Sequence, residues 1–168
     1  YTALVRFRAE LCDPGRTRPQ QQLALRFALH IIQDLQQPLH AGNGRDRGGN
    51  AIRVSVDGEE TNLHWVWDGV IPASAGHDRE AFIDSIDNAG LLRAPTAGDG
   101  DPLTWIAEST QLREQLYPAP AEIDADYRQR WLPVARARIA LAGIRSAAWL
   151  NETFAGCGDA MLSAETAH

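Results

Sequence analysis

Two short segments of this chain each carry a histidine and an aspartate four residues apart. His30 and Asp34 lie in HIIQDLQQPLH, which ends on His40, and His64 and Asp68 lie in NLHWVWD. Because four residues make about one helical turn, the two side chains of each pair share one face of a helix. The neighbouring residues are apolar, and a buried imidazole or carboxylate needs a partner. The spacing therefore predicts two helices that bring these side chains together around a divalent metal ion such as zinc.

Ordinary polar contacts are the alternative interpretation of these pairs. A single histidine–aspartate pair on a helix is more often a surface ion pair than a site. Two pairs, with His40 beyond the bend expected at Pro38, favour a metal site. His77 lies in a predicted loop without a matching partner, and we interpret it as solvent-exposed. The chain contains no GxSxG motif and no nucleotide-binding glycine pattern, so serine hydrolases and nucleotide-binding loops are disfavoured.

The remaining sequence predicts a mostly helical domain. The alternating segment AIRVSVDGEET, with the turn Asp57-Gly58, predicts a short β-hairpin. Asp101 followed by Pro102 is typical of a helix start, and Pro133 is expected to break the last helix. We expect helices at 1–11, 20–36, 62–71, 78–89, 102–117 and 122–154. The sequence thus indicates an all-α fold with one small hairpin, in a single domain over residues 1–168.

Composition limits the function classes. The net charge of −6, with 22 acidic and 16 basic residues, disfavours nucleic-acid binding through a basic patch. Bound metal weakens that objection, because each zinc ion brings two positive charges to its site. No apolar run reaches the roughly 18 residues of a membrane span. Cys12 and Cys157 do not form a CxxC zinc pair, which leaves buried thiols or one long-range disulfide.

The combined motif resembles the class I zinc-dependent nucleases of the S1/P1 type. The motif is HxxxDxxxxxH, then GGN, then TNLHxxWD, and its histidines and aspartates follow at intervals of four, six, twenty-four and four residues. Asp46, Gly48, Gly49 and Asn50 resemble the D-x-GGN segment of that family. WIAES and AGIRSAAWLN, further along the chain, also resemble family segments, so the likeness covers nearly the whole sequence.

The resemblance implies an all-α bundle shared with bacterial zinc phospholipase C and a cluster of three zinc ions. His40, His64 and Asp68 would hold one zinc, while His30 and Asp34 would serve the other two, with Asp34 as a catalytic bridging ligand. The implied reaction is hydrolysis of single-stranded DNA and RNA to 5′-phosphates, with removal of 3′-phosphates from nucleotides. It also implies that Asn50 and Trp65 contribute to a substrate pocket, and that the protein is secreted or periplasmic.

The sequence departs from the family pattern in two places. The family carries further zinc ligands ahead of the segment that resembles residues 25–40, and this chain lacks them. We therefore expect roughly the first third of the family domain to be absent, so that another segment supplies those ligands or the chain is inactive. Gln33 and Gln36 also replace a glycine and a histidine, and Gln36 is expected to alter the support around the ligands.

Two alternatives to a nuclease follow from the resemblance. One is a lipid phosphodiesterase like phospholipase C, in which the second pair comes sooner and ends in glutamate. The longer interval, the hairpin and Asp68 favour the nuclease over this relative. The other is a truncated zinc-binding domain without catalysis, an alternative that the absent ligands leave open.

Overall fold

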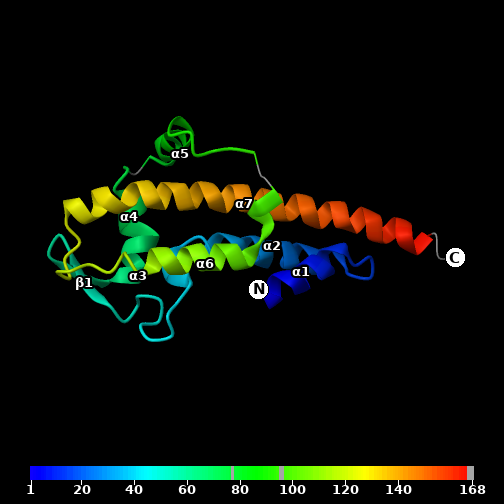
Figure 1. Ribbon diagram of the computed structural model, residues 1–168, viewed down its shortest axis with the longest axis horizontal. Coiled ribbons are helices and arrows are strands. Elements are labelled where there is room, and N and C mark those ends of the chain that lie inside the picture. Colours follow the sequence, from blue (N-terminus) through cyan, green and yellow to red (C-terminus); the bar gives the residue numbers. More distant parts are fainter. Residues whose placement is uncertain (77, 95–96, 166–168) are drawn as a thin grey trace.

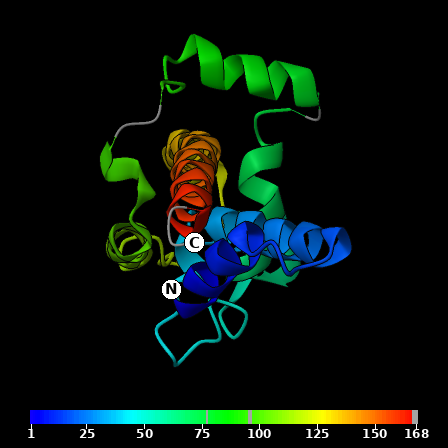
Figure 2. The same cartoon turned by 90° about the vertical axis from the view of Figure 1, so that its right-hand side faces the viewer.

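The computed structural model describes residues 1–76, 78–94 and 97–165, so the prediction for His77 lies outside the described residues. One long helix, α7 (Ala125–Glu165), runs along the whole molecule (Figure 1). The helices α1 (Thr2–Cys12), α2 (Arg18–Asp34) and α6 (Pro102–Arg113) lie along one side of α7. The helix α5 (Arg79–Asn88) lies beyond α7 on the other side (Figure 2). The architecture is a helical bundle, as the sequence predicts.

The helix ends follow from local sequence. Asp101 accepts hydrogen bonds from the backbone amides of Leu103 and Thr104, and Pro102 occupies the first turn of α6, so this predicted start is confirmed. The helix α2 ends at Asp34, two residues before the predicted end, and a short 3-10 helix η1 (Pro38–His40) follows. Because proline disfavours helical geometry in the residue before it, the chain turns at this point.

The predicted break at Pro133 is wrong, because α7 continues through it without interruption. Proline removes only one helical hydrogen bond, the one to the carbonyl of Gln129. Both residues are exposed, so water solvates that carbonyl. Trp131 and Ala135, on either side of the proline, are buried in the core. Their burial holds the helix together across a residue that would end an isolated one.

The predicted hairpin is present. The strands β1 (Arg53–Val56) and β2 (Glu59–Asn62) are antiparallel, and Asp57 and Gly58 form the turn with φ values of 51° and 87°. The next segment was expected as one helix over 62–71. It consists instead of a short α3 (Leu63–Trp65), a π-helical turn η2 (Val66–Val70) and a short α4 (Ile71–Ala73). The wider π turn lies where Val66, Trp67 and Ile71 are all buried, so core packing decides the local geometry.

Two groups of buried side chains stabilise the bundle. One lies between the hairpin, the segment 63–71 and the first half of α7, and it includes Trp67 and Trp131. The other lies between α1, α2, α6 and the second half of α7, and it includes Trp105 and Trp149. The helix α7 contributes Trp131 and Ala135 to the first group and Trp149 to the second, so it joins the two.

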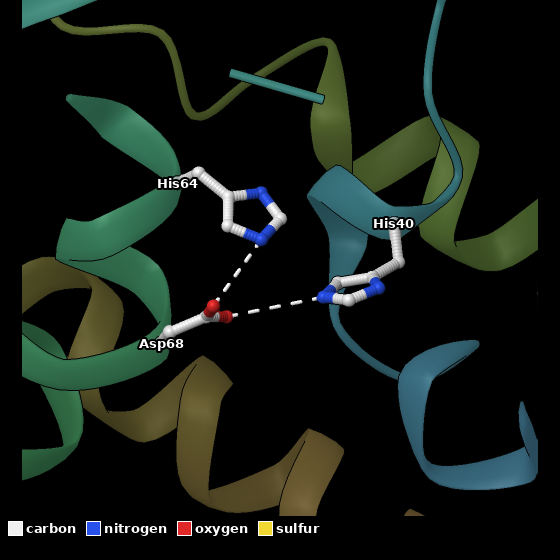
Figure 3. Close-up of side chains that lie close together, drawn as sticks. All are labelled: His40, His64 and Asp68. Carbon is white, nitrogen blue, oxygen red and sulfur yellow. Dashed lines mark ion pairs between the residues drawn. The ribbon is translucent and has the colours of Figure 1, made fainter. Parts of the chain in front are cut away.

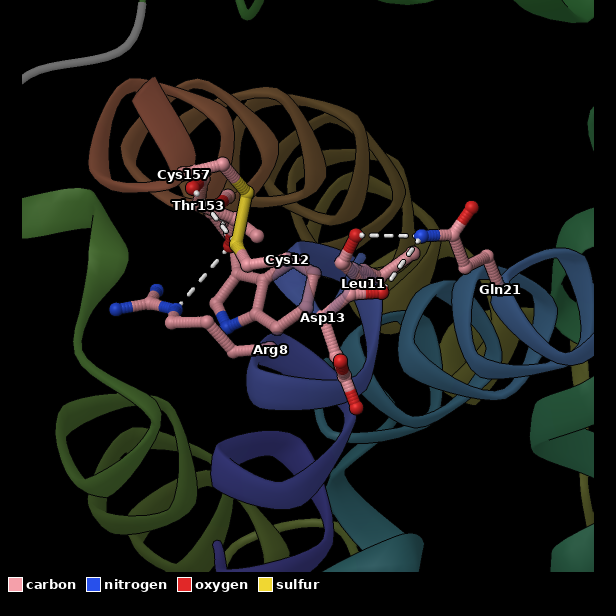
Figure 4. The surroundings of a disulfide bond; sticks show 8 residues. Arg8, Leu11, Cys12, Asp13, Gln21, Thr153 and Cys157 are labelled. Atoms are coloured by element: carbon pink, nitrogen blue, oxygen red, sulfur yellow. Dashed lines mark hydrogen bonds between the residues drawn. A yellow bond between two sulfur atoms is a disulfide. The ribbon is translucent and has the colours of Figure 1, made fainter. Parts of the chain in front are cut away.

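The two cysteines form a disulfide, which settles the alternative that the sequence leaves open. Cys12, at the end of α1, is bonded to Cys157 on α7 (Figure 4). Beside it, Arg8 donates a hydrogen bond of 3.1 Å to the hydroxyl of Thr153. The bond joins residues 145 positions apart and so fixes α1 against α7. Among the described residues, no helix is both long and apolar enough to cross a bilayer.

Candidate metal centre

Three of the predicted ligands meet between η1 and the segment α3–η2. The side chains of His40, His64 and Asp68 each offer one donor atom, and these atoms all lie within 4.8 Å of one another (Figure 3). Nε2 of His64 lies 3.2 Å from Oδ2 of Asp68, and Nε2 of His40 lies 3.9 Å from Oδ1. The two imidazole rings are tilted by 43° to each other, with centroids 4.9 Å apart. The group matches the size of a site for one metal ion.

Local structure places each of these side chains. His64 and Asp68 lie one turn apart on the same helical face, and the side chain of Asn62 caps the helix start by accepting from the amide of Trp65 at 2.9 Å. His40 is carried by the short helix that begins at Pro38, and the buried Leu39 anchors that helix. The bend at the proline therefore turns His40 toward the other two side chains.

Hydrogen bonds outside the triad fix its donor atoms. Nδ1 of His64 lies 2.7 Å from the carbonyl oxygen of Gly48, and since a carbonyl only accepts, this nitrogen carries the hydrogen. Nε2 of His64 then keeps its lone pair for a metal. The amide of Gln37 donates to Oδ1 of Asp68 at 2.9 Å. Two imidazoles and one carboxylate, held in this way, suit zinc as a set of three ligands with one position left open.

The other predicted pair lies beside the triad. Nε2 of His30 is 3.2 Å from Oδ2 of Asp34, and the same oxygen is 3.6 Å from Nδ1 of His40. Asp34 therefore stands between His30 and His40. The His30 side chain is 68% exposed. Among the described residues, only His40, His64 and Asp68 bring three donor atoms together, so His30 and Asp34 form a two-residue extension.

The two predicted substrate contacts lie near the centre, at the surface. Trp65 follows His64 directly and is 61% exposed, unlike the four buried tryptophans. Asn50 is also exposed, and its amide donates to the carbonyl of Arg47 at 3.0 Å. Trp65 thus presents a free aromatic surface, whereas part of the hydrogen-bonding capacity of Asn50 is used within its own loop.

Sequence reasoning missed several supporting residues. Gln37 was not singled out, although it directly precedes Pro38 and contacts Asp68. Gln36 was expected to alter the support around the ligands, and its side chain is buried against α7, where it accepts from Arg138 at 3.0 Å and Arg145 at 2.5 Å. No local pattern could have separated these two glutamines, because the contacts of Gln36 come from a helix about a hundred residues away.

A groove of about 440 Å³ lies next to the centre, between the end of α2 and α7. Gln37 and Pro38 line it on one side, and Trp67, Arg138 and Ile139 line it on others. None of the three ligands lines it, so it is a neighbour of the metal centre and not the centre itself.

Comparison with known proteins agrees with the site. A family model described as S1/P1 nuclease matches residues 1–155. Nuclease S1 of Aspergillus oryzae is 33% identical over 154 residues, which cover 76% of this chain and 53% of that protein. Endonuclease 4 of Arabidopsis thaliana is 33% identical over 157 residues, covering 78% and 50%. Nuclease P1 of Penicillium citrinum is 28% identical over 183 residues, covering 90% and 65%. The chain thus spans about half the length of the first two relatives and 65% of the third.

Proposed function

This chain belongs to the S1/P1 nuclease family, and from that premise we propose that it is a zinc-dependent phosphodiesterase acting on single-stranded DNA and RNA. The observation that carries the proposal is the triad of His40, His64 and Asp68, whose donor atoms lie within 4.8 Å of one another. We propose 5′-phosphates as its products and removal of 3′-phosphates from nucleotides as a second activity. The three relatives named above are nucleases or endonucleases by name, which supports the reaction class.

The chemistry follows from the donors that the chain provides. A zinc ion in the triad would supply a Lewis acid for a phosphate oxygen and would lower the pKa of bound water toward about 7. His40 and His64 contribute neutral nitrogens, and Asp68 contributes the one negative charge. Gln37 and the Gly48 carbonyl hold two of these three side chains in orientation, so little rearrangement is needed when the metal binds.

We extend the proposal to His30 and Asp34 as ligands of two further zinc ions, with Asp34 bridging them. Two side chains cannot complete such sites. Because the chain spans about half the length of relatives such as nuclease S1, we propose that polypeptide outside these 168 residues supplies the remaining ligands. Residues 1–168 would then form part of one nuclease domain. The disulfide supports a secreted or periplasmic location, since such bonds persist in oxidising compartments.

Trp65 is the proposed contact for an unpaired base. Aromatic side chains at a surface stack on bases with little dependence on sequence, and only single strands leave the base face free. Asn50 is proposed as a second, hydrogen-bonding contact.

A matched pair of substitutions tests the proposal. Asp68→Asn removes the only charged ligand of the triad, whereas Asp57→Asn changes a 69%-exposed carboxylate paired with Arg128 on the hairpin turn. In protein that includes the polypeptide outside residues 1–168, we expect zinc, measured by elemental mass spectrometry, and chelator-sensitive cleavage of a single-stranded oligonucleotide in the wild type and in Asp57→Asn. Both are expected to be lost in Asp68→Asn.

Two results would overturn the mechanism. Cleavage that persists in excess chelator would exclude zinc as its source, and full activity of Asp68→Asn would exclude the triad. Zinc bound without any cleavage would favour a non-catalytic zinc-binding domain. Hydrolysis of phosphatidylcholine in place of the oligonucleotide would favour the lipid phosphodiesterase.

A further inference from the structure

We propose that Asp46 and Tyr117 are positioning residues of the metal centre, which act by locking the loop whose Gly48 carbonyl orients His64. This inference rests on the proposed zinc function. Neither residue belongs to the triad. Their effect passes through the backbone of the loop over residues 43–50, which we call the clamp loop. Three features of the loop support this role: its bond to His64, its fit between two ligand-bearing elements, and its anchoring.

The first feature is the bond between the clamp loop and His64. The 2.7 Å contact of Nδ1 with the carbonyl of Gly48 sets which ring nitrogen carries the hydrogen. It also fixes the rotation of the ring, so that Nε2 points at Asp68, 3.2 Å away. If the carbonyl moved, the ring would lose its preference for one tautomer, and Nε2 would no longer point at Asp68.

The second feature is the tight fit of the clamp loop. Gly48 and Gly49 have φ values of +64° and +82°, a conformation that residues with a Cβ rarely adopt. A Cβ on Gly48 would lie 2.7 Å from the carbonyl oxygen of Leu39, and one on Gly49 would lie 3.3 Å from the backbone nitrogen of His64. The loop therefore fills the space between η1, which carries His40, and α3, which carries His64. Its position sets the separation of the two imidazoles.

The third feature is the anchor. Asp46 is only 6% exposed, and its Oδ2 accepts from the hydroxyl of Tyr117 at 2.5 Å and from the amide of Asn43 at 3.1 Å. Burial opposes ionisation, but the hydrogen bonds from Tyr117 and Asn43 and the nearby backbone amides of Gly49 and Gly48 outweigh it and lower the pKa of the Asp46 carboxyl. Burial and the same carboxylate raise the pKa of Tyr117 to about 12, so the hydroxyl remains a donor. The ionised Asp46 thus stabilises the conformation of the clamp loop through the hydrogen bonds that its side chain accepts.

Tyr117 connects this anchor to the bundle. It lies four residues beyond the end of α6 and 71 residues from Asp46 in sequence. Asn43 of the loop also donates to the Tyr117 hydroxyl at 3.2 Å. Apart from these bonds to Tyr117 and the contact of Gly48 with His64, the hydrogen bonds of the loop are short-range, such as the amide of Arg45 donating to the side chain of Asn43 at 2.8 Å. Removing the Tyr117 hydroxyl would therefore remove the link between the loop and the segment after α6 without changing any metal ligand.

The test compares substitutions in the anchor with controls of the same chemistry elsewhere. The anchor variants are Asp46→Ala, Asp46→Asn and Tyr117→Phe. Asp57→Asn is the control for the carboxylate. Thr153→Val is the control for the hydroxyl, because Thr153 is 1% exposed and donates to the carbonyl of Trp149 beside the disulfide, away from the clamp loop and the triad. Thermal unfolding of each variant shows whether it folds.

Two readouts separate positioning from plain stability. One is zinc affinity, measured in competition with a chelating dye. The other is the tautomer of His64 in the metal-free protein, read from the ring nitrogens by NMR at about pH 8, where histidines are ordinarily neutral. We expect Asp46→Ala and Tyr117→Phe to bind zinc about 10- to 100-fold more weakly and to lose the single His64 tautomer. Asp46→Asn keeps an oxygen acceptor for Tyr117 and should recover part of the affinity.

The outcomes distinguish this inference from the proposed function. Anchor variants that melt earlier but keep wild-type zinc affinity and the His64 tautomer would overturn it and leave Asp46 a structural residue. A wild type that binds no zinc would contradict the proposed function instead. The tautomer in the metal-free protein would still decide the inference in that case. The same loss of affinity in Thr153→Val would show a general effect of destabilisation and would also overturn it.

Discussion

Replacing Glu108 by glutamine should leave two buried arginines without their counter-charge. Glu108 on α6 accepts from Arg138 through Oε2 and from Arg145 through Oε1, both at 2.7 Å. The two arginine side chains, on α7, are only 8% and 5% exposed, whereas Glu108 is 36% exposed. A glutamine has one acceptor oxygen, so its amide nitrogen would face one of the guanidiniums.

The expected cost follows from these contacts. A hydrogen bond to a charged group contributes about 1.5–3 kcal/mol, and breaking a buried ion pair on one side costs about 3–5 kcal/mol. Because Glu108 is partly exposed, water screens part of this effect. We expect the free energy of unfolding to fall by about 2–4 kcal/mol, which lowers the melting temperature by roughly 2–4 °C per kcal/mol in a chain of this size.

Urea unfolding followed by circular dichroism measures this loss. Glu152→Gln is the matched control, since Glu152 pairs with Arg8 at 3.4 Å and the two side chains are 44% and 41% exposed. An exposed pair of this kind should contribute less than about 1 kcal/mol. The reasoning would be refuted if Glu108→Gln lowered the free energy of unfolding by no more than the control Glu152→Gln does.

The pH dependence gives a second check on Glu108. Burial raises the pKa of its carboxyl, but hydrogen bonds from Arg145 and Arg138 outweigh burial and hold the pKa below its ordinary value. The pKa of Glu108 is thus lower in the folded than in the unfolded protein. The stabilisation by its charge is therefore fully present above the unfolded pKa and is lost as the pH falls through the folded pKa. The difference in the free energy of unfolding between the wild type and Glu108→Gln should be fully present at neutral pH and disappear in strong acid. A difference that does not change with pH would contradict an ionic origin.

Two further predictions concern the disulfide and the exposed tryptophan. Replacing Cys12 and Cys157 by serine removes a link between residues 145 positions apart. It should lower the free energy of unfolding, measured in urea, by about 2–5 kcal/mol. Equal stability of the wild type with and without reductant would contradict this prediction. Trp65→Ala should leave the melting temperature and zinc content unchanged, because the side chain is 61% exposed. It should weaken binding of a short single-stranded oligonucleotide by about 1–3 kcal/mol, measured as a rise in KM, and an unchanged KM would exclude stacking at this residue.

Sequence predicts the parts of this molecule that depend on neighbours along the chain. The spacing of His64 and Asp68 places them on one helical face whatever the rest of the fold does. The turn at Asp57-Gly58 and the helix start at Asp101 also need only local geometry. These features were therefore predicted correctly, and so was the approach of His40 after the proline bend.

The features that the sequence does not predict depend on contacts between distant segments. Pro133 lies inside α7 because buried neighbours on both sides outweigh one lost hydrogen bond. The support of His64 by Gly48, and of that loop by Tyr117, joins residues 16 and more positions apart. Sequence periodicity shows which residues share one helix face. It therefore predicts candidate metal ligands, but not the distant groups that orient their side chains.

Asp34 lies between the triad and His30, so its negative charge acts on both parts of the proposed metal centre. The triad contains one carboxylate, so a zinc ion there would leave a local charge of about +1. Asp34 lies 3.6 Å from His40, close enough to share that charge with any ion held beside His30. A site with this balance would attract a phosphodiester anion even though the whole chain carries a charge of −6. In the proposed function, metal bound at a few side chains would thus take the place of a basic patch in holding nucleic acid.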